Sequence, residues 1–294
     1  MLGEYDNRRL SGQRLGFIGL GNMGLPMARH IHTAGADLRV WNRGQARLNS
    51  AVHFGLIPVG SLAELAEHVG SGIVCINVTD SDVIHSLIFG AQGLCSYLSS
   101  EAMVIDFGTT GVTATKSFAS KLRWIDAPVS GGQVGAEAAN LSIMVGGALD
   151  DYERALPILE TVGKRVIHVG PSGAGQVTKL ANQLIVAQTI DAVAQALRIV
   201  ELSGVSISLA REAMLGGFAA SRVLELHGSR MEKKNFTPGG RAQLQLKDIR
   251  LVCDLAAELG FHSSTLNNCL QLWEEMISRG WGECDHSGLY KLYE

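Results

Sequence analysis

The sequence of 294 residues has few cysteines and no evident cluster of metal ligands. The five cysteines lie far apart and form no C-x-x-C pair: Cys75, Cys95, Cys253, Cys269 and Cys284. This spacing favours reduced, buried thiols in a cytoplasmic protein over a disulfide framework or a zinc site. The nine histidines show no metal-ligand spacing, and we interpret them, including His227, His262 and His286, as structural or surface residues. No metal site is predicted.

Positive charge and long apolar runs are also scarce. The formal net charge is −3, whereas nucleic-acid-binding proteins normally carry a basic patch. Apolar runs such as residues 72–78 are far shorter than the roughly 20 residues that cross a bilayer. The polar segment 1–13 has no apolar signal-peptide core and is expected to be a short flexible leader. Neither a nucleic acid nor a membrane is therefore a predicted partner.

Proline is rare, with 6 residues, whereas glycine is abundant, with 35. From Arg14 to about Gly170, short apolar runs alternate with helical segments, and continuous apolar runs are typical of strands covered on both faces. Strands are expected at residues 15–18, 37–41, 73–78, 103–107, 124–126, 142–145 and 166–168, with crossover helices such as 23–34 and 61–68. This alternation predicts a Rossmann-type, doubly wound α/β domain over residues 14–172.

The pattern changes after Gly173. From Gln176 to Ser203 no proline or glycine interrupts the chain, and these residues would make a helix roughly 42 Å long. It is apolar nearly all round, so we expect it to be buried. Further helices are expected at 207–215, 242–259 and 264–279. Residues 173–294 are thus predicted to form an all-α domain around a long interdomain helix, with enough apolar surface for a homodimer or homotetramer.

A glycine-rich motif follows the first expected strand. It consists of Gly19, Leu20, Gly21, Asn22, Met23 and Gly24. G-x-G-x-x-G alone is weak evidence, but here a strand precedes it and a helix follows it, as dinucleotide binding requires. The first glycine permits a tight turn, the second lets the backbone approach a pyrophosphate, and the third permits close helix–strand packing. The pyrophosphate then binds at the positive end of the helix.

The end of the second expected strand indicates which dinucleotide binds. An NAD enzyme usually has Asp or Glu here, which accepts a hydrogen bond from the ribose 2′-hydroxyl. This sequence has Asn42 and Arg43 instead, and an arginine can pair with the 2′-phosphate of NADP. NADP is therefore the expected cofactor. NAD stays possible if Arg43 is a solvated loop residue.

Three further segments resemble a known family. They are DAPVSGG at residues 126–132, GAGQVTKLAN at 173–182, and Lys247-Asp248. With the glycine motif, they resemble the 3-hydroxyisobutyrate dehydrogenase family, also called β-hydroxyacid dehydrogenases, in order and spacing over nearly the whole chain after Arg14. The resemblance implies hydride transfer between NAD(P) and a small 3-hydroxy acid or its semialdehyde.

The resemblance also implies how the substrate binds. In this family a Ser-Gly-Gly turn binds the substrate carboxylate, which implies that role for Ser130, Gly131 and Gly132. A hydroxyl and backbone N–H groups would form an uncharged anion cradle, which holds an acid without trapping it in a buried ion pair. Asn182 matches the asparagine that hydrogen-bonds the substrate.

Lys179 matches the catalytic lysine of the family. Hydride transfer to an aldehyde leaves an alkoxide that must be protonated, and the reverse reaction needs the hydroxyl proton removed. A lysine can do both if burial or nearby positive charge lowers its pKa towards the working pH. We expect Lys179 on the first turn of the long helix, facing a cleft between the domains. Asn182 follows three residues later on the same face.

Further positions are cofactor contacts by resemblance. Lys247 matches a lysine near the nicotinamide, and Thr109 matches a threonine near the cofactor ribose and nicotinamide. Asn77 and Val78 fall where the backbone of the family meets the dinucleotide. Asn77, Val78 and Thr109 lie at or just after the carboxyl ends of expected strands, where such sheets bind ligands.

The sequence departs from the family pattern at several points. Ala139 stands where members usually have glycine, and Gly240 aligns with a position that often holds an aromatic residue. Residues 107–112 also lack the common Ser-Thr-Pro pattern. Gly240 is expected to border the substrate pocket, so a wider or more polar pocket would follow, and 3-hydroxyisobutyrate is not carried over as the substrate.

The leading hypothesis is an NADP-linked reductase of small semialdehydes or the reverse 3-hydroxy acid dehydrogenase, with a small carboxylate-bearing substrate. An imine reductase of the same fold is an alternative, although such enzymes generally lack the lysine. A non-catalytic NADP-binding scaffold is a second alternative. Because Lys179, Asn182 and Ser130 are all present, both alternatives rank below the dehydrogenase.

Overall fold

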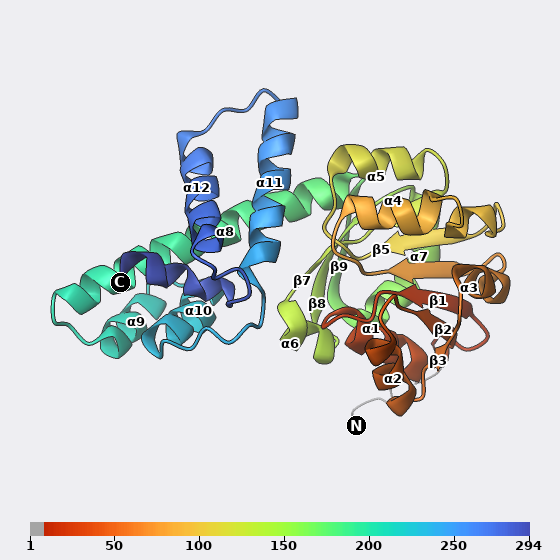
Figure 1. The fold of residues 1–294 in the computed structure, drawn as a ribbon, viewed down its shortest axis with the longest axis horizontal. Coiled ribbons are helices and arrows are strands. Elements are labelled where there is room, and N and C mark those ends of the chain that lie inside the picture. Colours follow the sequence, from red (N-terminus) through yellow and green to blue (C-terminus); the bar gives the residue numbers. More distant parts are fainter. Residues whose placement is uncertain (1–8) are drawn as a thin grey trace. The chain divides into compact units, whose positions relative to one another are not determined.

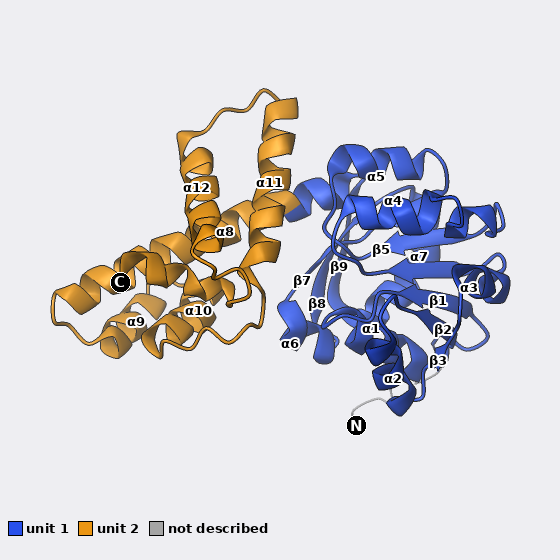
Figure 2. Ribbon diagram, viewed as in Figure 1, with its two compact units in different colours: residues 1–179 blue, residues 180–294 orange. Residues whose placement is uncertain are grey.

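The computed structural model describes residues 9–294. The chain divides into two compact units, unit 1 (Met1–Lys179) and unit 2 (Leu180–Glu294), coloured separately in Figure 2. Residues 1–8 of the predicted leader lie outside the described part. Residues 9–13 differ from that expectation, because Leu10 is fully buried and its N–H donates to the carbonyl of Ala34 at 2.9 Å. They belong to the packed first unit.

Unit 1 is built on one nine-stranded sheet. Figure 1 shows this sheet with the helices that pack on it. The strand order is β3-β2-β1-β4-β5-β6-β8-β7, with β9 also paired to β8. Strands β1 to β6 run parallel, whereas β8 is antiparallel to both β6 and β7. The strands are β1 (Arg14–Ile18), β2 (Asp37–Trp41), β3 (Ile57–Pro58), β4 (Ile73–Ile76), β5 (Met103–Asp106), β6 (Arg123–Asp126), β7 (Val129–Ser130), β8 (Leu141–Gly146) and β9 (Gly163–Gly170).

Helices cover both faces of this sheet. They are α1 (Gly24–Thr33), α2 (Gln45–His53), α3 (Leu62–Val69), α4 (Ser81–Phe89), the short 3-10 helix η1 (Leu94–Ser96), α5 (Val112–Ala119), α6 (Gly132–Glu137) and α7 (Leu149–Val162). One apolar cluster joins the sheet to α1, α2, α6 and α7, and a second joins it to α3, α4 and α5. In β1, Phe17 packs in the first cluster and Ile18 in the second, as a strand buried on both faces requires. The prediction of a doubly wound α/β domain is confirmed.

Unit 2 is all-helical, and no strand occurs among its described residues. It contains most of α8 (Ala174–Leu202), then α9 (Ile207–Leu215), α10 (Arg222–Glu232), α11 (Ala242–Glu258), α12 (Ser264–Ser278) and the 3-10 helix η2 (His286–Tyr293). Its core includes Leu197 of α8, Ile249 of α11, Trp273 of α12 and Tyr290 of η2. The prediction of an all-α second domain around a long helix is confirmed. The boundary between the two units falls at Lys179, inside that helix.

The expectation that the long helix is buried all round is wrong for the single chain. Ile185, Ile199 and Leu202 are 67%, 64% and 70% exposed, and Ala192 is exposed between them. Positions 185, 192 and 199 repeat every seven residues, so they share one face of α8. By length and composition α8 could also cross a membrane, but a core helix of a soluble protein passes the same test.

Candidate active site

The loop between β1 and α1 combines tight packing with one open position. Gly19 has a φ of +94°, and a Cβ there would lie 2.2 Å from the carbonyl oxygen of Asn77. A Cβ on Gly24 would lie 1.8 Å from the carbonyl oxygen of Gly19, so α1 can start here only with glycine. A Cβ on Gly21 would meet no atom within 4 Å. The backbone at Gly21 is thus open to a ligand at the N-terminus of α1.

The loop after β2 is tied to this glycine loop by side chains. The Asn42 amide oxygen accepts a hydrogen bond from the Leu20 N–H at 2.9 Å, and its Nδ2 donates to the Gly44 carbonyl at 3.0 Å. Sequence reasoning missed Arg47, whose guanidinium donates to the Asn22 side chain at 3.0 Å. Its spacing of four residues from Arg43, across the start of α2, was the available signal.

A hollow of about 420 Å³ opens beside this loop. It is lined by Trp41, Asn42, Arg43, Gln45, Leu48, Pro58, Val59 and Gly60. Arg43 lines the hollow and is exposed, and Arg47 is exposed in the first turn of α2. The hollow offers an aromatic ring and apolar side chains beside cationic groups. That combination fits an adenosine carrying a phosphate.

The loops after β4 and β5 lie next to each other. A Cβ on Gly108 would lie 2.9 Å from the Val78 carbonyl oxygen, and the Asn77 N–H donates to the Ile18 carbonyl at 2.8 Å. Thr109 is half-buried between Gly108 and the buried Thr110. The carboxylate of Asp106 accepts hydrogen bonds from the N–H of Gly108 at 2.8 Å and from the hydroxyl of Thr110 at 3.3 Å. Asp106, the last residue of β5, therefore holds the residues on both sides of Thr109.

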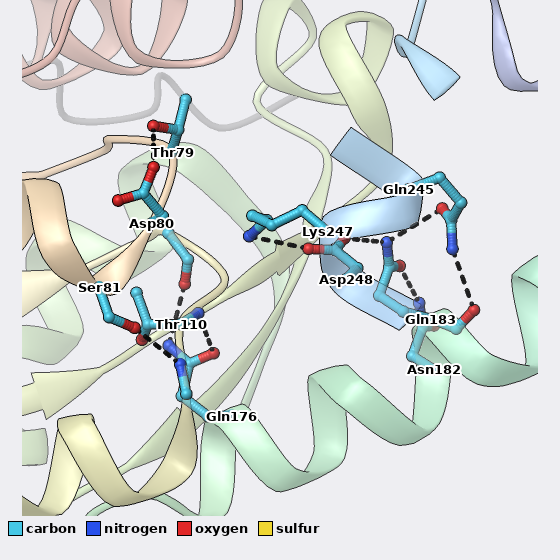
Figure 3. Close-up of polar contacts among 12 residues, drawn as sticks. Thr79, Asp80, Ser81, Thr110, Gln176, Asn182, Gln183, Gln245, Lys247 and Asp248 are labelled. Carbon is cyan, nitrogen blue, oxygen red and sulfur yellow. Dashed lines mark hydrogen bonds and ion pairs between the residues drawn. The ribbon is translucent and has the colours of Figure 1, made fainter. Parts of the chain in front are cut away.

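Gln176, in the first turn of α8, holds the same loop from the other side. Its Oε1 accepts from the Thr110 N–H at 3.1 Å, and its Nε2 donates to the Gly108 carbonyl at 2.9 Å, as Figure 3 illustrates for Thr110 and Gln176. Asp126, at the end of β6, accepts from the N–H groups of Gly173 and Gln176 at 2.8 and 3.0 Å. Burial raises the pKa of Asp126 to about 6, although these N–H groups oppose the shift. Sequence reasoning assigned no role to Gln176.

The Ser-Gly-Gly turn joins β7 to α6. Ser130 pairs with Ser142 of β8, and Gly131 and Gly132 have φ values of +135° and +62°, which favour glycine. Both glycines are exposed, so their backbone groups are accessible. Ala139, after α6, has a φ of +49°. This left-handed conformation gives a physical reason why glycine is usual there, and alanine carries some strain.

Lys179 and Asn182 lie on α8, as expected. The helix begins at Ala174, so Lys179 stands in its second turn, and the expectation of the first turn is wrong by one turn. Lys179 is only 6% exposed. Asn182 is half-buried, and its amide Nδ2 donates to the Gln183 side-chain oxygen at 3.0 Å.

Within unit 2, a polar cluster joins α8 to α11 (Figure 3). The Lys247 ammonium lies 2.9 Å from the carboxylate of Asp248, which is almost fully buried. The amide nitrogen of Gln183 donates to Asp248 at 2.6 Å and to Gln245 at 3.3 Å. The structure thus connects Asn182, through Gln183 and Asp248, to Lys247. Sequence reasoning missed Gln183 and Gln245, because single glutamines on a helix carry no motif.

Gly240 lies against a histidine. A Cβ at Gly240 would lie 3.0 Å from His286 Nε2. His227, Asp285 and His286 place potential ligand atoms within 4.8 Å of one another. The Asp285 oxygens already accept from the N–H groups of Gly239, Gly240 and Ser287 and from the Ser287 hydroxyl. We therefore interpret this cluster as a structural hydrogen-bond network that joins the loop before α11 to the start of η2. Burial lowers the pKa of His286 to about 4, so its ring is neutral near pH 7.

Comparison with known families covers almost the whole chain. The model for the NAD binding domain of 6-phosphogluconate dehydrogenase matches residues 14–170. The model for the NAD-binding region of NADP-dependent 3-hydroxyisobutyrate dehydrogenase matches residues 173–293. Unit 1 is therefore an NAD(P)-binding domain.

Individual relatives are similar over their full length. The 2-hydroxy-3-oxopropionate reductase of Escherichia coli (strain K12) is 37% identical over 286 residues, which cover 96% of this chain and 97% of the relative. An NAD-dependent L-serine dehydrogenase of Pseudomonas aeruginosa is 28% identical over 295 residues, covering 96% and 98%. The structure of Mycobacterium tuberculosis 3-hydroxyisobutyrate dehydrogenase with L-serine superposes with a TM-score of 0.84 at 26% identity, covering 95% of this chain and 98% of that one.

Proposed function

The chain belongs to the 3-hydroxyisobutyrate dehydrogenase family of hydroxyacid oxidoreductases, and we propose that it transfers a hydride between NADP(H) and a small 3-hydroxy acid or its semialdehyde. One observation carries the proposal. Lys179 is 6% exposed and stands one turn after Gln176, the residue that holds the Thr109 loop. A buried lysine beside the loop assigned to the cofactor is suited to proton exchange at the reacting oxygen.

The proposed chemistry is a balanced reduction of an aldehyde. NADPH, when bound, supplies a hydride to the carbonyl carbon. Lys179 gives a proton from its ammonium group to the carbonyl oxygen, so the C=O π bond is replaced by a C–H and an O–H bond. The neutral amine then regains a proton from solvent. In the reverse direction the neutral amine of Lys179 would remove the hydroxyl proton, while the carbon that bears the hydroxyl would lose its hydride to NADP⁺.

Recognition of the substrate acid is proposed for the Ser130–Gly131–Gly132 turn. Its exposed glycine backbone and hydroxyl can surround a carboxylate with donors. Asn182 would hold the hydroxyl or carbonyl oxygen near Lys179. The E. coli relative is named for a three-carbon semialdehyde that carries a carboxylate and a hydroxyl. A small polar semialdehyde of this kind is the substrate class we propose.

Preference for NADP over NAD is proposed from Arg43 and Arg47. Both are exposed near the hollow after β2, and two guanidinium groups can surround a 2′-phosphate with charge-assisted hydrogen bonds. A small carboxylate-bearing substrate is the proposed partner, together with further copies of the chain. The exposed face of α8 at Ile185, Ala192 and Ile199 supports a homodimer or homotetramer, for which light scattering is the direct measurement.

The proposed function is tested by initial rates across short hydroxy acids, semialdehydes and cyclic imines, with NADPH and NADH. Lys179→Ala should lower kcat for the best semialdehyde by about 1,000-fold while NADPH still binds. Lys233→Ala, at an exposed lysine of unit 2, is the matched control and should keep full activity. Full activity of Lys179→Ala would contradict the proposal. Faster turnover of imines would favour an imine reductase, and NADPH binding without turnover would favour a scaffold.

A further inference from the structure

We infer that Gln176 is a positioning residue, which fixes the Thr109 loop against the first turn of α8, one turn before Lys179. The inference rests on the proposed function, because it takes Lys179 as the proton-transfer group and Thr109 as a cofactor contact. It concerns a side chain that would touch neither substrate nor cofactor. Its action would be through the relative placement of two segments of unit 1.

The contacts of Gln176 enclose Thr109 on both sides. The residue is fully buried, and its amide group bonds the N–H of Thr110 and the carbonyl of Gly108, the two neighbours of Thr109 in the chain. These are main-chain groups, so the loop cannot move away from α8 without breaking both bonds at once. The amide supplies the one donor and the one acceptor that the two backbone groups need.

The backbone of Gln176 is itself anchored. Asp126 accepts from its N–H and from that of Gly173, the residue before α8, so the start of the helix is held to the end of β6. A Cβ at Gly175 would lie 2.6 Å from the Asp126 carbonyl oxygen, which leaves no room for the helix to shift towards the sheet. On the other side, Asp106 holds Gly108 and Thr110. Gln176 is the link between these two anchored segments.

The position of Gln176 on the helix makes this link relevant to Lys179. Residues three apart on an α-helix lie on the same side, roughly 4.5 Å along the axis. A shift or rotation of the first turn of α8 therefore moves Lys179 directly. Misplacement of a reacting group by about 1 Å can lower a rate about 100-fold. Loss of the Gln176 amide should thus act on the chemical step more than on binding.

Gln176→Met tests the inference, because methionine keeps the length and helix propensity of glutamine but can form neither bond. We expect kcat to fall by about 30- to 100-fold, with the substrate KM and the NADPH dissociation constant unchanged. The primary isotope effect measured with NADPH deuterated at the transferred position should rise as hydride transfer becomes limiting. Gln271→Met is the control, since Gln271 is exposed on α12 and has no assigned role. Active enzyme is counted by NADPH titration, so a misfolded fraction does not enter kcat.

A second variant keeps the test valid if Gln176→Met folds poorly. Gln176→Asn keeps the amide but is one methylene shorter, so it cannot bond both backbone groups, and kcat should fall less than in the methionine variant. A double-mutant cycle with Lys179→Ala then separates positioning from general damage. In the Lys179→Ala background, Gln176→Met should have little further effect on kcat. Equal losses in both backgrounds, or an unchanged isotope effect, would overturn the inference, whereas high activity of Lys179→Ala alone would overturn the proposed function instead.

Discussion

Two glutamines on α8, seven residues apart, link this helix to other segments in different ways. Gln176 belongs to unit 1, is fully buried and bonds the main chain of the loop after β5. Gln183 belongs to unit 2, is half-buried and bonds the side chains of Asn182, Gln245 and Asp248 (Figure 3). The same residue type on one helix therefore joins backbone in one unit and side chains in the other.

The difference indicates which features of each unit a substitution can change. Main-chain partners persist when the side chains of the Thr109 loop are replaced, so the backbone of this loop keeps its geometry. By contrast, a single substitution at Gln245 or Asp248 removes one of the side-chain partners of Gln183. We therefore expect changes in substrate preference to arise in unit 2 more readily than changes in the hydride-transfer geometry of unit 1.

The largest expected effect concerns the buried carboxyl that anchors α8 in unit 1. Burial raises the pKa of Asp126 to about 6, above its value in an unfolded chain. Between about pH 4 and pH 6 the native protein therefore holds a proton that the unfolded chain has lost. This contribution to stability is complete below the unfolded pKa and is lost as the pH rises through about 6. Between acid pH well below 4 and pH 7 it amounts to roughly 3 kcal/mol, most of which is lost above pH 4.

Urea unfolding of the wild type and Asp126→Asn at pH 4 to 7 measures this contribution. The free energy of unfolding of the wild type, minus that of the variant, should fall as the pH rises to about 6 and then stay constant. Asp254→Asn, at an exposed carboxylate on α11, should leave the pH profile of the wild type unchanged. A difference that is the same at every pH would show that folding does not raise the pKa of Asp126.

The next effect tests the part of the dinucleotide site in unit 1 that relies on side chains. Arg43→Ala combined with Arg47→Ala should raise the KM for NADPH about 100-fold, because charge-assisted bonds to the 2′-phosphate are lost. The KM for NADH should stay the same, since NADH has no such phosphate. Arg165→Ala, an exposed arginine on β9, is the control. An equal rise for both cofactors would assign these arginines to stability or to the pyrophosphate.

The difference between local backbone features and contacts of distant side chains explains how much could be predicted from the sequence. The glycine loop and the strand ends were predictable, because their function depends on missing Cβ atoms and on strands of continuous apolar residues. Gln176 and Gln183 were not, because their partners lie 66 residues (Thr110) and 65 residues (Asp248) away in the chain. Helices α2 and α10, which are rich in polar residues, were not among the helices named from the sequence.

The long helix shows the limit of periodicity as evidence. Its composition correctly predicted one uninterrupted α8, but burial all round was wrong for the single chain, since Ile185 and Ile199 are exposed. The spacing of apolar residues in the sequence is the same whether a helix face packs inside its own chain or lies on the surface of that chain. The sequence therefore predicts the helix but does not identify which of its faces the single chain leaves exposed.

The smallest expected effect concerns the side-chain links of unit 2. Gln183→Met removes the bonds to Asp248 and Gln245 and the acceptor for Asn182, while the helix itself is preserved. Asn182 then loses its fixed orientation, and we expect the KM for the semialdehyde to rise about tenfold, as for the loss of one neutral hydrogen bond. Because the Thr109 loop and Lys179 stay in place, kcat and NADPH affinity should match the wild type. Steady-state kinetics beside Gln271→Met provide the measurement. A loss in kcat as large as that of Gln176→Met would mean that both glutamines act on the chemical step, and the contrast between the two units would no longer hold.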